Sequence, residues 1–371
     1  MELVLLFVSL FRILCVVAAG FMVGYWIYKY HNNEDMTLIE YKSFTLSDDT
    51  LYPEFTLCVW DPFMDAKFNY TNRVTKESYL QYLNGSISVN DSLTNVRFDS
   101  VTVNLFEYLN HVDIGMKVGE KDISHRCTNT TVCSFINFRN NFNGFAILGF
   151  LKCFGFEINR RYSSNISYVS MRFKNTLPDV LKQVGKVYAM FNYPNQLLRK
   201  VWDPKQIWND PTNDKLTTHF PIYSMEILRR RNKKANPCFE DWRYFDKSVI
   251  QENMEIVRCT APYRLSDHRF PVCNTQTQMN DSSVSMSKMA HNFAPPCQEI
   301  SYFSFKHHLR QEPGYGRFLV TVDYPDRAKI ITQSQAINIH ALIGNIGGYV
   351  GLFLGRLKSI NTEGIYDIKF F

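Results

Sequence analysis

The chain begins with a long apolar run. From Leu3 to Tyr28 the residues are apolar apart from Arg12 and a few small polar residues. An α-helix rises about 1.5 Å per residue, so a run of this length can cross a hydrocarbon core of about 30 Å. Arg12 lies in the first half of the run, from where its side chain can reach the cytosolic interface. We therefore predict a transmembrane helix over residues 3–29.

A cleaved signal peptide is the competing interpretation, because Val17-Ala-Ala-Gly20 offers the small residues of a cleavage site. Signal peptides begin with a basic segment. This chain has none ahead of the run, and the apolar stretch continues through Phe21–Trp26. The transmembrane interpretation also places four aromatic residues at the outer membrane interface, Tyr25, Trp26, Tyr28 and Tyr30.

The cysteines beyond the run form an even set, which favours disulfides in an oxidising compartment. They are Cys58, Cys127, Cys133, Cys153, Cys238, Cys259, Cys273 and Cys297. Cys15 lies inside the run. Zinc is the alternative, but the sequence has no Cys-x-x-Cys pair and no histidine at a ligand spacing from a cysteine pair, so we predict no metal. The residues alone do not say which cysteines pair.

Sequons for N-glycosylation lie only between the apolar run and a glycine-rich stretch near the C-terminus. Their asparagines are Asn69, Asn84, Asn90, Asn129, Asn165 and Asn280. N-glycosylated sequons belong to the surfaces of exported domains, so they agree with the cysteines. We predict an extracellular, glycosylated and disulfide-bonded domain.

Composition and charge narrow the class of protein. With 371 residues, 45% hydrophobic and 15% aromatic, the chain can bury a large core. The net charge of +6 is modest, and an extracellular compartment excludes nucleic acid as a partner. The one dense basic segment, Arg229–Lys234, lies ahead of Cys238. It predicts a solvated loop, with a protease-processing loop as the alternative.

Enzyme chemistry has no support in the sequence. The chain lacks Gly-x-Ser-x-Gly, His-Glu-x-x-His and phosphate-loop motifs, and its carboxylates form no paired constellation. We therefore predict neither an enzyme nor a cofactor. Histidines titrate near a pH of about 6.5 and can sense protons. We favour ordinary surface or packed positions over proton sensing for the six candidates, His219, His268, His291, His307, His308 and His340.

Hydrophobic periodicity predicts a mixed α+β fold for the extracellular part. Alternation over residues 101–105, 166–173 and 318–324 indicates strands with one buried face. Residues 246–257 place apolar side chains on one side of a helix. The polar stretch from residue 69 to about 110 indicates loops and short helices.

The glycine-rich stretch Gly344–Gly355 has two interpretations. It is a surface turn, or it is a pore segment whose glycines let helices of several subunits approach and turn backbone carbonyls toward an ion. A turn does not need the embedded apolar residues 352–354, so we favour the pore segment. Its candidate residues are Gly344, Asn345, Gly347, Gly348, Gly351, Leu352, Phe353 and Gly355.

Five segments of the chain carry a resemblance to a known family. They are Leu51-Tyr-Pro-Glu-Phe-Thr-Leu-Cys58, Lys152-Cys-Phe-Gly-Phe156, Asn192-Tyr-Pro-Asn-Gln-Leu-Leu-Arg199, Pro295-Pro-Cys-Gln-Glu-Ile-Ser-Tyr302 and Gly347-Gly-Tyr-Val-Gly-Leu-Phe-Leu-Gly355. In this order they resemble motifs of the degenerin/epithelial sodium channel family, which includes the acid-sensing channels.

The resemblance implies a subunit of a homo- or heterotrimeric channel, held in the lipid of the plasma membrane, that conducts sodium ions and is blocked by amiloride. It implies an extracellular domain over residues 30–340 with a palm sheet, a finger and a helical thumb at about 203–300. A pre-pore segment over 341–355 would begin a second transmembrane helix. The resemblance also implies the disulfides Cys58–Cys153, Cys127–Cys133, Cys238–Cys297 and Cys259–Cys273.

The C-terminal end departs from the family's pattern. Residues 356–371 form a divergent polar tail, Leu357 stands where the family has a filter serine, and Arg356 would put positive charge in a cation pathway. We therefore expect the second transmembrane helix to be missing and the chain to be truncated at both ends. The alternative function is a non-conducting isoform or single-span ectodomain protein that modulates full-length subunits.

Overall fold

The computed structural model divides into two compact units, residues 1–38 with 332–371, and residues 39–331. We call the first the helix unit and the second the body. The structure describes residues 2–32, 35–43, 54–68, 74–88, 90–118, 121–128, 133–146, 149–159, 166–174, 176–182, 187–193, 195–198, 217–264, 270–305, 308–310, 319–325 and 327–363.

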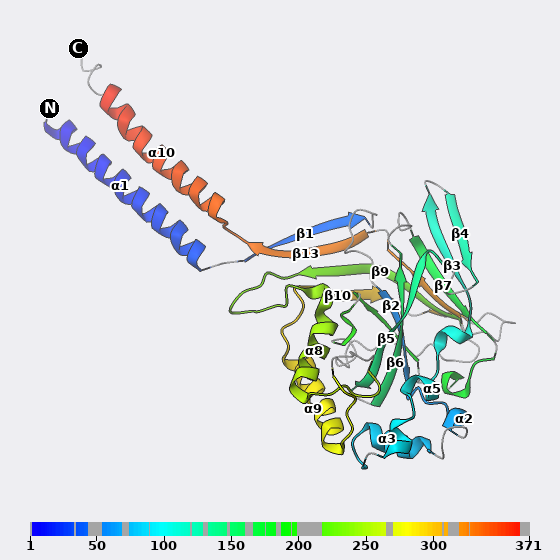
Figure 1. The fold of residues 1–371 in the computed structure, drawn as a ribbon. Coiled ribbons are helices and arrows are strands. Elements are labelled where there is room, and N and C mark those ends of the chain that lie inside the picture. The colour runs from blue at the N-terminus through cyan, green and yellow to red at the C-terminus, as the bar shows by residue number, and fades with distance from the viewer. Residues whose placement is uncertain are drawn as a thin grey trace. The chain divides into compact units, whose positions relative to one another are not determined.

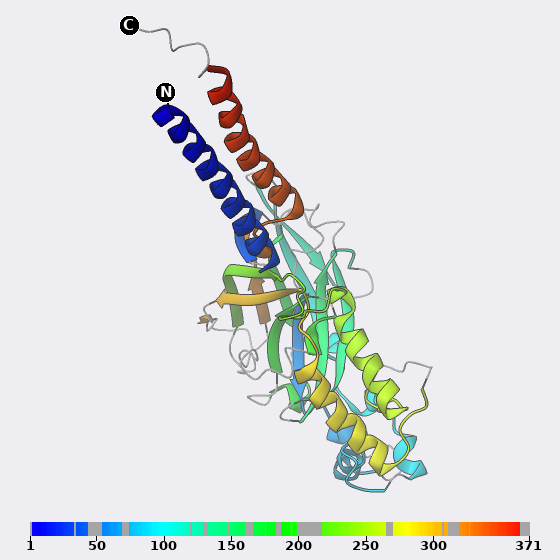
Figure 2. The same cartoon turned by 90° about the vertical axis from the view of Figure 1, so that its left-hand side faces the viewer.

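The helix unit contains two long helices, α1 (Glu2–His31) and α10 (Ile339–Glu363). They lie side by side in two views, with the N- and C-termini at the same end, so they are antiparallel (Figures 1 and 2). α1 covers the transmembrane helix predicted over residues 3–29. α10 continues beyond the predicted pre-pore segment, so the polar sequence is helical as far as Glu363. Residues 364–371 lie outside the described part of the chain.

One large sheet has the strand order β1-β13-β9-β12-β7-β3-β4, and β10 and β11 also pair with β9. β12 runs parallel to β9 and antiparallel to β7. The bounds of these strands are β1 (Asp35–Ser43), β3 (Leu109–Val118), β4 (Lys121–Cys127), β7 (Ile166–Phe173), β9 (Thr217–Arg229), β10 (Gln298–Phe305), β11 (His308–Arg310), β12 (Leu319–Asp323) and β13 (Arg327–Gln335).

The second sheet has the order β5-β6-β2-β8. Its strands are β2 (Glu54–Trp60), β5 (Ile136–Ala146), β6 (Gly149–Ile158) and β8 (Val187–Asn192). The two sheets share a core, because Leu57 and Phe154 of the second are buried in one cluster with Val169 and Val322 of the first. β2 is buried on both faces, since Cys58 belongs to a different cluster on its other side.

Within the body, short helices lie at one end of the sheets and a pair of longer helices lies along one side of them (Figure 1). The short ones are α2 (Asp65–Phe68), α3 (Lys76–Leu83), α4 (Asp91–Thr94), α5 (Phe98–Val101), η1 (Leu105–Tyr108) and α6 (Asp179–Lys182). A 3₁₀ turn, η4 (Trp242–Tyr244), leads into the pair, which is α8 (Phe245–Val257) and α9 (Gln276–Asn292). The body is therefore α+β, as predicted.

Local predictions are confirmed where one periodicity dominates a segment. β7 and β12 form at two of the predicted strands, although Phe318 lies outside the described residues, and α8 forms over the predicted helix 246–257. Ile256 is 61% exposed, although it follows the buried Val249 by seven residues and therefore lies on the same side of α8, so the last turn of that side is not covered. Short helices occupy the stretch from about 74 to 108, as expected.

The strand predicted over residues 101–105 is wrong. Val101 ends α5 and Leu105 begins η1. The link between them is extended for a few residues, and Thr102 forms an isolated bridge with Phe63. Thr102 and Val103 are both 0% exposed, so the alternation of polar and apolar residue types did not reflect an alternation of exposure and burial.

Candidate functional site

α1 has the character of a membrane-spanning helix. Its segment Ser9–His31 has a mean hydropathy of 2.0, and in the described part of the chain no other helix is long and apolar enough to cross a membrane. Large apolar side chains along it remain exposed, including Phe7 at 73% and Phe21 at 71%. A helix that is apolar all round requires apolar surroundings. Together with the disulfide-rich body, α1 is consistent with a membrane protein that has an extracellular domain.

The C-terminal end of α1 carries the predicted aromatic belt. Tyr25 packs edge-on against Trp26 with ring centroids 5.8 Å apart. The Lys29 Nζ atom lies 5.4 Å from the centroid of the Tyr25 ring. Aromatic rings with a polar tip and basic side chains both favour the membrane–water interface.

α10 is a continuous helix through the glycine-rich stretch. The expected display of backbone carbonyls toward an ion is therefore not found, because an α-helix engages those carbonyls in its own hydrogen bonds. The glycines leave an open face instead. A Cβ atom would meet no described atom within 4 Å at any of four positions, Gly344, Gly347, Gly348 and Gly351.

The two sides of α10 differ in burial. Leu342 is 8% exposed, whereas Leu352 is 55% exposed. The other predicted residues, Asn345 and Phe353, are half-buried, and Gly355 lies within the helix. α10 therefore has a packed side and an open side, and most of the predicted pore residues lie on the open one.

The packed side of α10 faces α1. The Trp26 ring of α1 stacks on the Tyr349 ring of α10, with centroids 6.4 Å apart and planes at 27°. Cys15, the one free cysteine among the described residues, is 6% exposed in a helix whose apolar residues are otherwise mostly exposed. The pair thus has a defined contact surface within the helix unit.

The body contains four disulfides, and they join the pairs that the family resemblance implies. Their Cα atoms are separated by 3.9 Å for Cys58–Cys153, 5.2 Å for Cys127–Cys133, 4.9 Å for Cys238–Cys297 and 5.0 Å for Cys259–Cys273. Cys58 and Cys153 are direct partners in the β2–β6 register. The last two pairs bracket α8 and α9, because each joins a residue before one helix to a residue after the other.

Two of the motif segments meet beside α8. The Gln196 Nε2 atom donates to the backbone oxygens of Gln298, at 2.9 Å, and Trp242, at 3.1 Å. The Asp246 carboxylate accepts from the backbone nitrogens of Leu197, at 2.7 Å, and Leu198, at 3.1 Å. These polar residues satisfy buried backbone groups, which explains their residue types without any catalytic role.

The basic segment Arg229–Lys234 continues from the end of β9 as a loop, and this loop is only partly solvated, with Asn232 and Lys234 exposed. Arg230 is half-buried, forms an ion pair with Glu299 and donates from Nη1 to the backbone oxygen of Pro296 at 3.2 Å. Lys233 and Asn236 pair in a tight turn. The segment therefore ties the end of β9 to the motif that contains Pro295–Tyr302.

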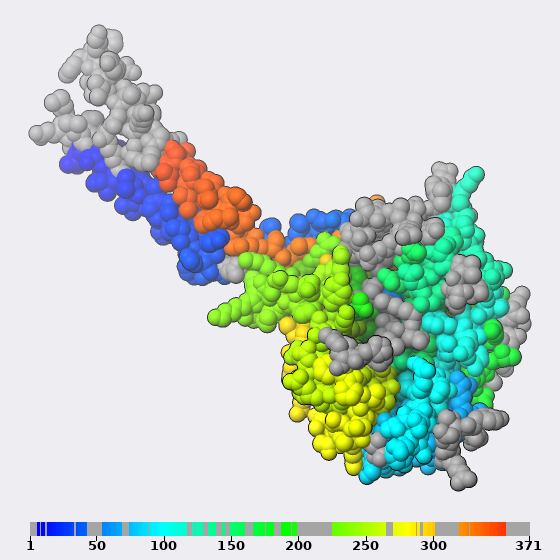
Figure 3. Space-filling view, in the orientation of Figure 1, coloured from blue at the N-terminus to red at the C-terminus, as the bar shows by residue number. Residues whose placement is uncertain are grey.

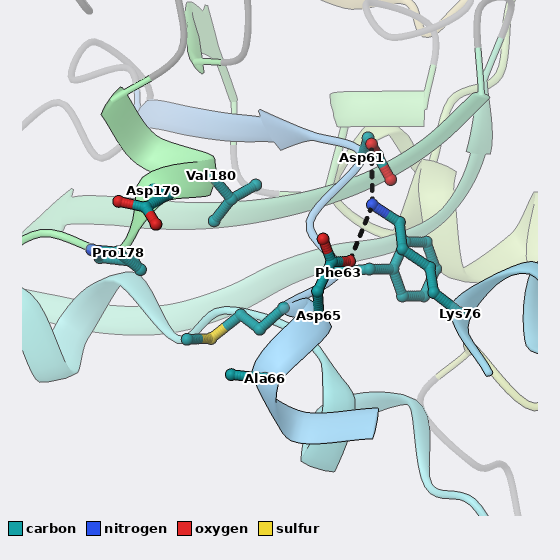
Figure 4. A pocket seen from close by; sticks show the side chains of 9 residues that line it. Asp61, Phe63, Asp65, Ala66, Lys76, Pro178, Asp179 and Val180 are labelled. Atoms are coloured by element: carbon teal, nitrogen blue, oxygen red, sulfur yellow. Dashed lines mark hydrogen bonds and ion pairs between the residues drawn. The ribbon is translucent and has the colours of Figure 1, made fainter. Parts of the chain in front are cut away.

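A cavity of about 340 Å³ opens between the end of β2, α2 and α6 (Figure 4). The Lys76 Nζ atom lies 3.3 Å from Asp61 Oδ2 and 3.5 Å from Asp65 Oδ1. Asp179 lies across the cavity from this pair (Figure 4). Two of the three carboxylates already pair with Lys76, and Asp65 is 81% exposed, so water and the chain satisfy much of this charge. We assign the cavity no ligand.

Lys152 is a feature that the sequence did not predict. Its side chain is 2% exposed, and its Nζ atom donates to Asp99 Oδ1 at 2.9 Å and to Thr102 Oγ1 at 3.0 Å. Burial lowers the pKa of Lys152, and the hydrogen bond and charge of Asp99 oppose that shift. A lysine inside an apolar strand was the only local signal, because its partner lies on α5, 53 residues away.

The remaining predicted residues are spread over the chain. Asn84, Asn90 and Asn280 are exposed, whereas Asn69, Asn129 and Asn165 lie outside the described residues. His219 and His308 are register partners on β9 and β11, His291 lies in α9 and His340 is exposed in α10. His268 and His307 lie outside the described residues. The four candidate histidines that the structure describes thus belong to three separate parts of the fold.

Comparisons with known proteins give little beyond this geometry. No family model matches the chain, and no curated protein does. Among solved structures, a proton-activated chloride channel matches with a TM-score of 0.33 and 7% sequence identity, over 98% of this chain and 99% of that one. These values are too low to assign a fold or a function. The resemblance to degenerin/epithelial sodium channels therefore stays a prediction.

Proposed function

We propose that the protein is a subunit of a sodium channel in the plasma membrane, with α1 and α10 in the lipid and the body outside the cell. The observation that carries this proposal is the antiparallel α1–α10 pair with its open glycine face. Two such helices leave both termini in the cytosol. Helices can cross lipid because they satisfy their own backbone hydrogen bonds.

α10 can serve as the second membrane helix if its basic residues lie at the cytosolic interface. Its apolar part, Ile339–Phe353, is about 22 Å long. That is shorter than a hydrocarbon core of about 30 Å. Arg356 and Lys358 follow in the same helix, and long basic side chains can extend along lipid to reach water. With Arg12 of α1, they would follow the positive-inside rule.

The open side of α10 supports assembly with other subunits. Its glycines recur at a spacing of three and four residues on one helical face, at Gly344, Gly348, Gly351 and Gly355. Small residues let membrane helices approach closely. A homo- or heterotrimer, sodium selectivity and block by amiloride follow from the family resemblance alone. So do the names palm for the large sheet, finger for α2–α5 and thumb for α8–α9.

A non-conducting protein that modulates related channel subunits is the second candidate. The short apolar part of α10 favours it, because α1 alone then anchors the chain. Arg356 favours it as well, since a ring of positive charge in a pore opposes the passage of cations.

Assembly is tested with a matched pair of leucines in α10. In a Cys15→Ser background, Leu352→Cys places a thiol on the open side, and Leu342→Cys places one on the packed side. We expect disulfide-linked chains from Leu352→Cys alone on non-reducing gels of membranes. Equal linkage from both variants, or a monomer on native gels, would contradict assembly through this side of α10.

Conduction is tested by voltage clamp of cells that express the chain alone. We expect no amiloride-sensitive current from the chain alone, because three copies of Arg356 would oppose cations; as a channel subunit the chain would then conduct only in a heterotrimer with related subunits. Replacing the chain from Arg356 onward with Ala-Ser and an apolar helix should preserve surface trimers and favour sodium current. A robust sodium current from the unchanged chain would overturn the role given to Arg356. A repaired chain that stays monomeric at the surface would overturn the channel proposal.

A further inference from the structure

The three described sequons lie around one hydrophobic cluster. Asn84 follows α3, Asn90 precedes α4 and Asn280 lies in α9. Their neighbours Leu83, Leu93 and Met279 are all buried in that same cluster. In the space-filling view the cyan surface of the short helices adjoins the yellow surface of α9 (Figure 3). The three asparagines therefore share one end of the body.

Gly85 brings the first and third sequons into direct contact. It has a positive φ of 67°, and a Cβ atom there would lie 2.9 Å from the backbone nitrogen of Asn280. Only a glycine allows the chain to turn this close to α9. The Asn84 sequon is thus packed against the helical backbone that carries Asn280.

All three asparagines are exposed. The Asn90 side chain caps α4, but it does so with Oδ1, which accepts from the Leu93 backbone nitrogen at 2.9 Å. The cap does not use the Nδ2 atom, which is the atom that carries a glycan. Substitution at Nδ2 therefore preserves the cap.

The third residue of each sequon separates Asn280 from the other two. Ser86 and Ser92 are exposed. Ser282 is 0% exposed, and its hydroxyl makes no hydrogen bond within the described residues. A buried hydroxyl without a partner costs free energy in the folded state. A sequon requires a hydroxyl at this position, and that requirement explains why Ser282 is a serine although its hydroxyl has no role in the fold.

We propose that Asn84, Asn90 and Asn280 all carry N-linked oligosaccharides, and that Asn280 accepts its glycan only before α9 packs into the body. The enzyme must recognise the hydroxyl in the third position, and the folded body encloses Ser282. Ser86 and Ser92 stay accessible in the folded protein, so Asn84 and Asn90 accept glycans before or after folding. The inference rests on the extracellular placement of the body in the proposed function.

The transfer uses an oligosaccharide carried on a lipid diphosphate. The asparagine Nδ2 atom forms a bond to the anomeric carbon of the first sugar, and the bond from that carbon to the diphosphate oxygen breaks. The lipid diphosphate leaves with the bonding electrons, and the amide gives up one proton. No oxidant or reductant takes part.

Site occupancy is tested in cells with three matched variants, Ser86→Ala, Ser92→Ala and Ser282→Ala. Each removes one sequon and leaves its asparagine in place. We expect each variant to lose the mass of one glycan, and peptide mapping after N-glycosidase treatment to mark the corresponding asparagine. Ser282→Ala should have an unfolding temperature no lower than that of the parent chain. An Asn280 without glycan beside modified Asn84 and Asn90 would overturn the assignment.

The order of folding and transfer is tested on the full chain made while synthesis of the lipid-linked donor is blocked. The folded, oxidised protein in detergent is then incubated with oligosaccharyltransferase and a lipid-linked oligosaccharide. We expect transfer to Asn84 and Asn90, and transfer to Asn280 only after reduction and unfolding. Equal transfer to Asn280 in the folded chain would overturn the proposed order.

Failure of the proposed function gives a different result. If the body were not exported, every asparagine would lack a glycan in cells and the cysteines of the body would react as free thiols. In the cell-free experiment the purified chain would still show the difference between Asn280 and the other two sites. Loss of that difference contradicts the inference about Ser282, and leaves the membrane topology to be judged from the cells.

Discussion

At the scale of single residues, the body places ionisable side chains where water does not reach. Lys152 is 2% exposed, while its partner Asp99 is 46% exposed. Desolvation is therefore much larger for the lysine than for the carboxylate. Because burial lowers the pKa of Lys152 in the folded chain, its charge costs stability at neutral pH, and that cost falls as the pH rises through the lowered pKa.

The unequal exposure predicts unequal effects of two substitutions. Asp99→Ala leaves a buried ammonium without its carboxylate, and we expect a loss of about 3–5 kcal/mol in unfolding free energy. Lys152→Met removes the buried charge and leaves Asp99 to water, so the loss should be smaller. Denaturant titration of each variant provides the comparison. A larger loss for Lys152→Met would contradict this account.

Buried tyrosines in the cluster around α3 predict the response to alkali. Burial raises the pKa of Tyr79, Tyr82 and Tyr263 above the ordinary value of 10.0. Above that pH the unfolded chain loses phenolic protons that the folded chain keeps. These tyrosines therefore do not lower the unfolding free energy below pH 10.0, and they lower it increasingly as the pH rises further.

Tyr79→Phe isolates one of these groups. The Tyr79 hydroxyl donates to the Val96 backbone oxygen at 3.1 Å, so its removal should cost about 1 kcal/mol near neutral pH. Above a pH of about 10 the variant should lose stability less steeply than the parent, by up to about 1.4 kcal/mol per pH unit. Urea denaturation at several alkaline pH values tests this. Parallel curves would show that Tyr79 does not contribute.

At the scale of elements, the turn after α3 and the start of α9 hold each other in place. Gly85 has a positive φ, and a Cβ atom there would lie 2.9 Å from two backbone atoms, Asn280 N and Gln276 O. Backbone atoms cannot rotate away as a side chain can. The contact between α3 and α9 therefore depends on a residue that has no side chain.

Gly85→Ala should separate these elements. The left-handed conformation costs an alanine about 1–2 kcal/mol, and the close backbone contact adds to that loss. We expect a lower unfolding temperature and faster amide exchange in α3 and the first turns of α9. Ser88→Ala, at an exposed position nearby, is the control and should behave as the parent. Unchanged exchange in α9 would contradict the contact.

At the scale of the whole molecule, one apolar helix and a body with four disulfides predict the covalent form of the protein. The membrane fraction should keep the chain during carbonate extraction, because α1 is long and apolar enough to cross a membrane and the proposed topology embeds it in lipid. Non-reduced peptide maps should contain Cys58–Cys153 and Cys127–Cys133. Each such bond typically contributes about 2–4 kcal/mol. Free thiols at all four positions would place the body in a reducing compartment and contradict this topology.

Local patterns were sufficient for the elements that one periodicity governs. The apolar run predicts α1 because all sides of that helix are apolar. One-sided patterns predict α8 and β7 because one side of each segment packs on the core and the other faces water along its length. The family resemblance implied the four cysteine pairs that the structure contains. The same reasoning failed at residues 101–105, where a short extended link imitates a strand.

Packing between distant segments settled the rest. Lys152 bonds to Asp99, and Gln196 bonds to Trp242 and Gln298, so each of these contacts joins residues that are far apart in the sequence. Ser282 is buried, while Asn280 in the same helix is exposed. The glycine stretch likewise became one open side of a continuous helix. No local pattern encodes these features, because a side chain's environment is created by the segments that fold against it.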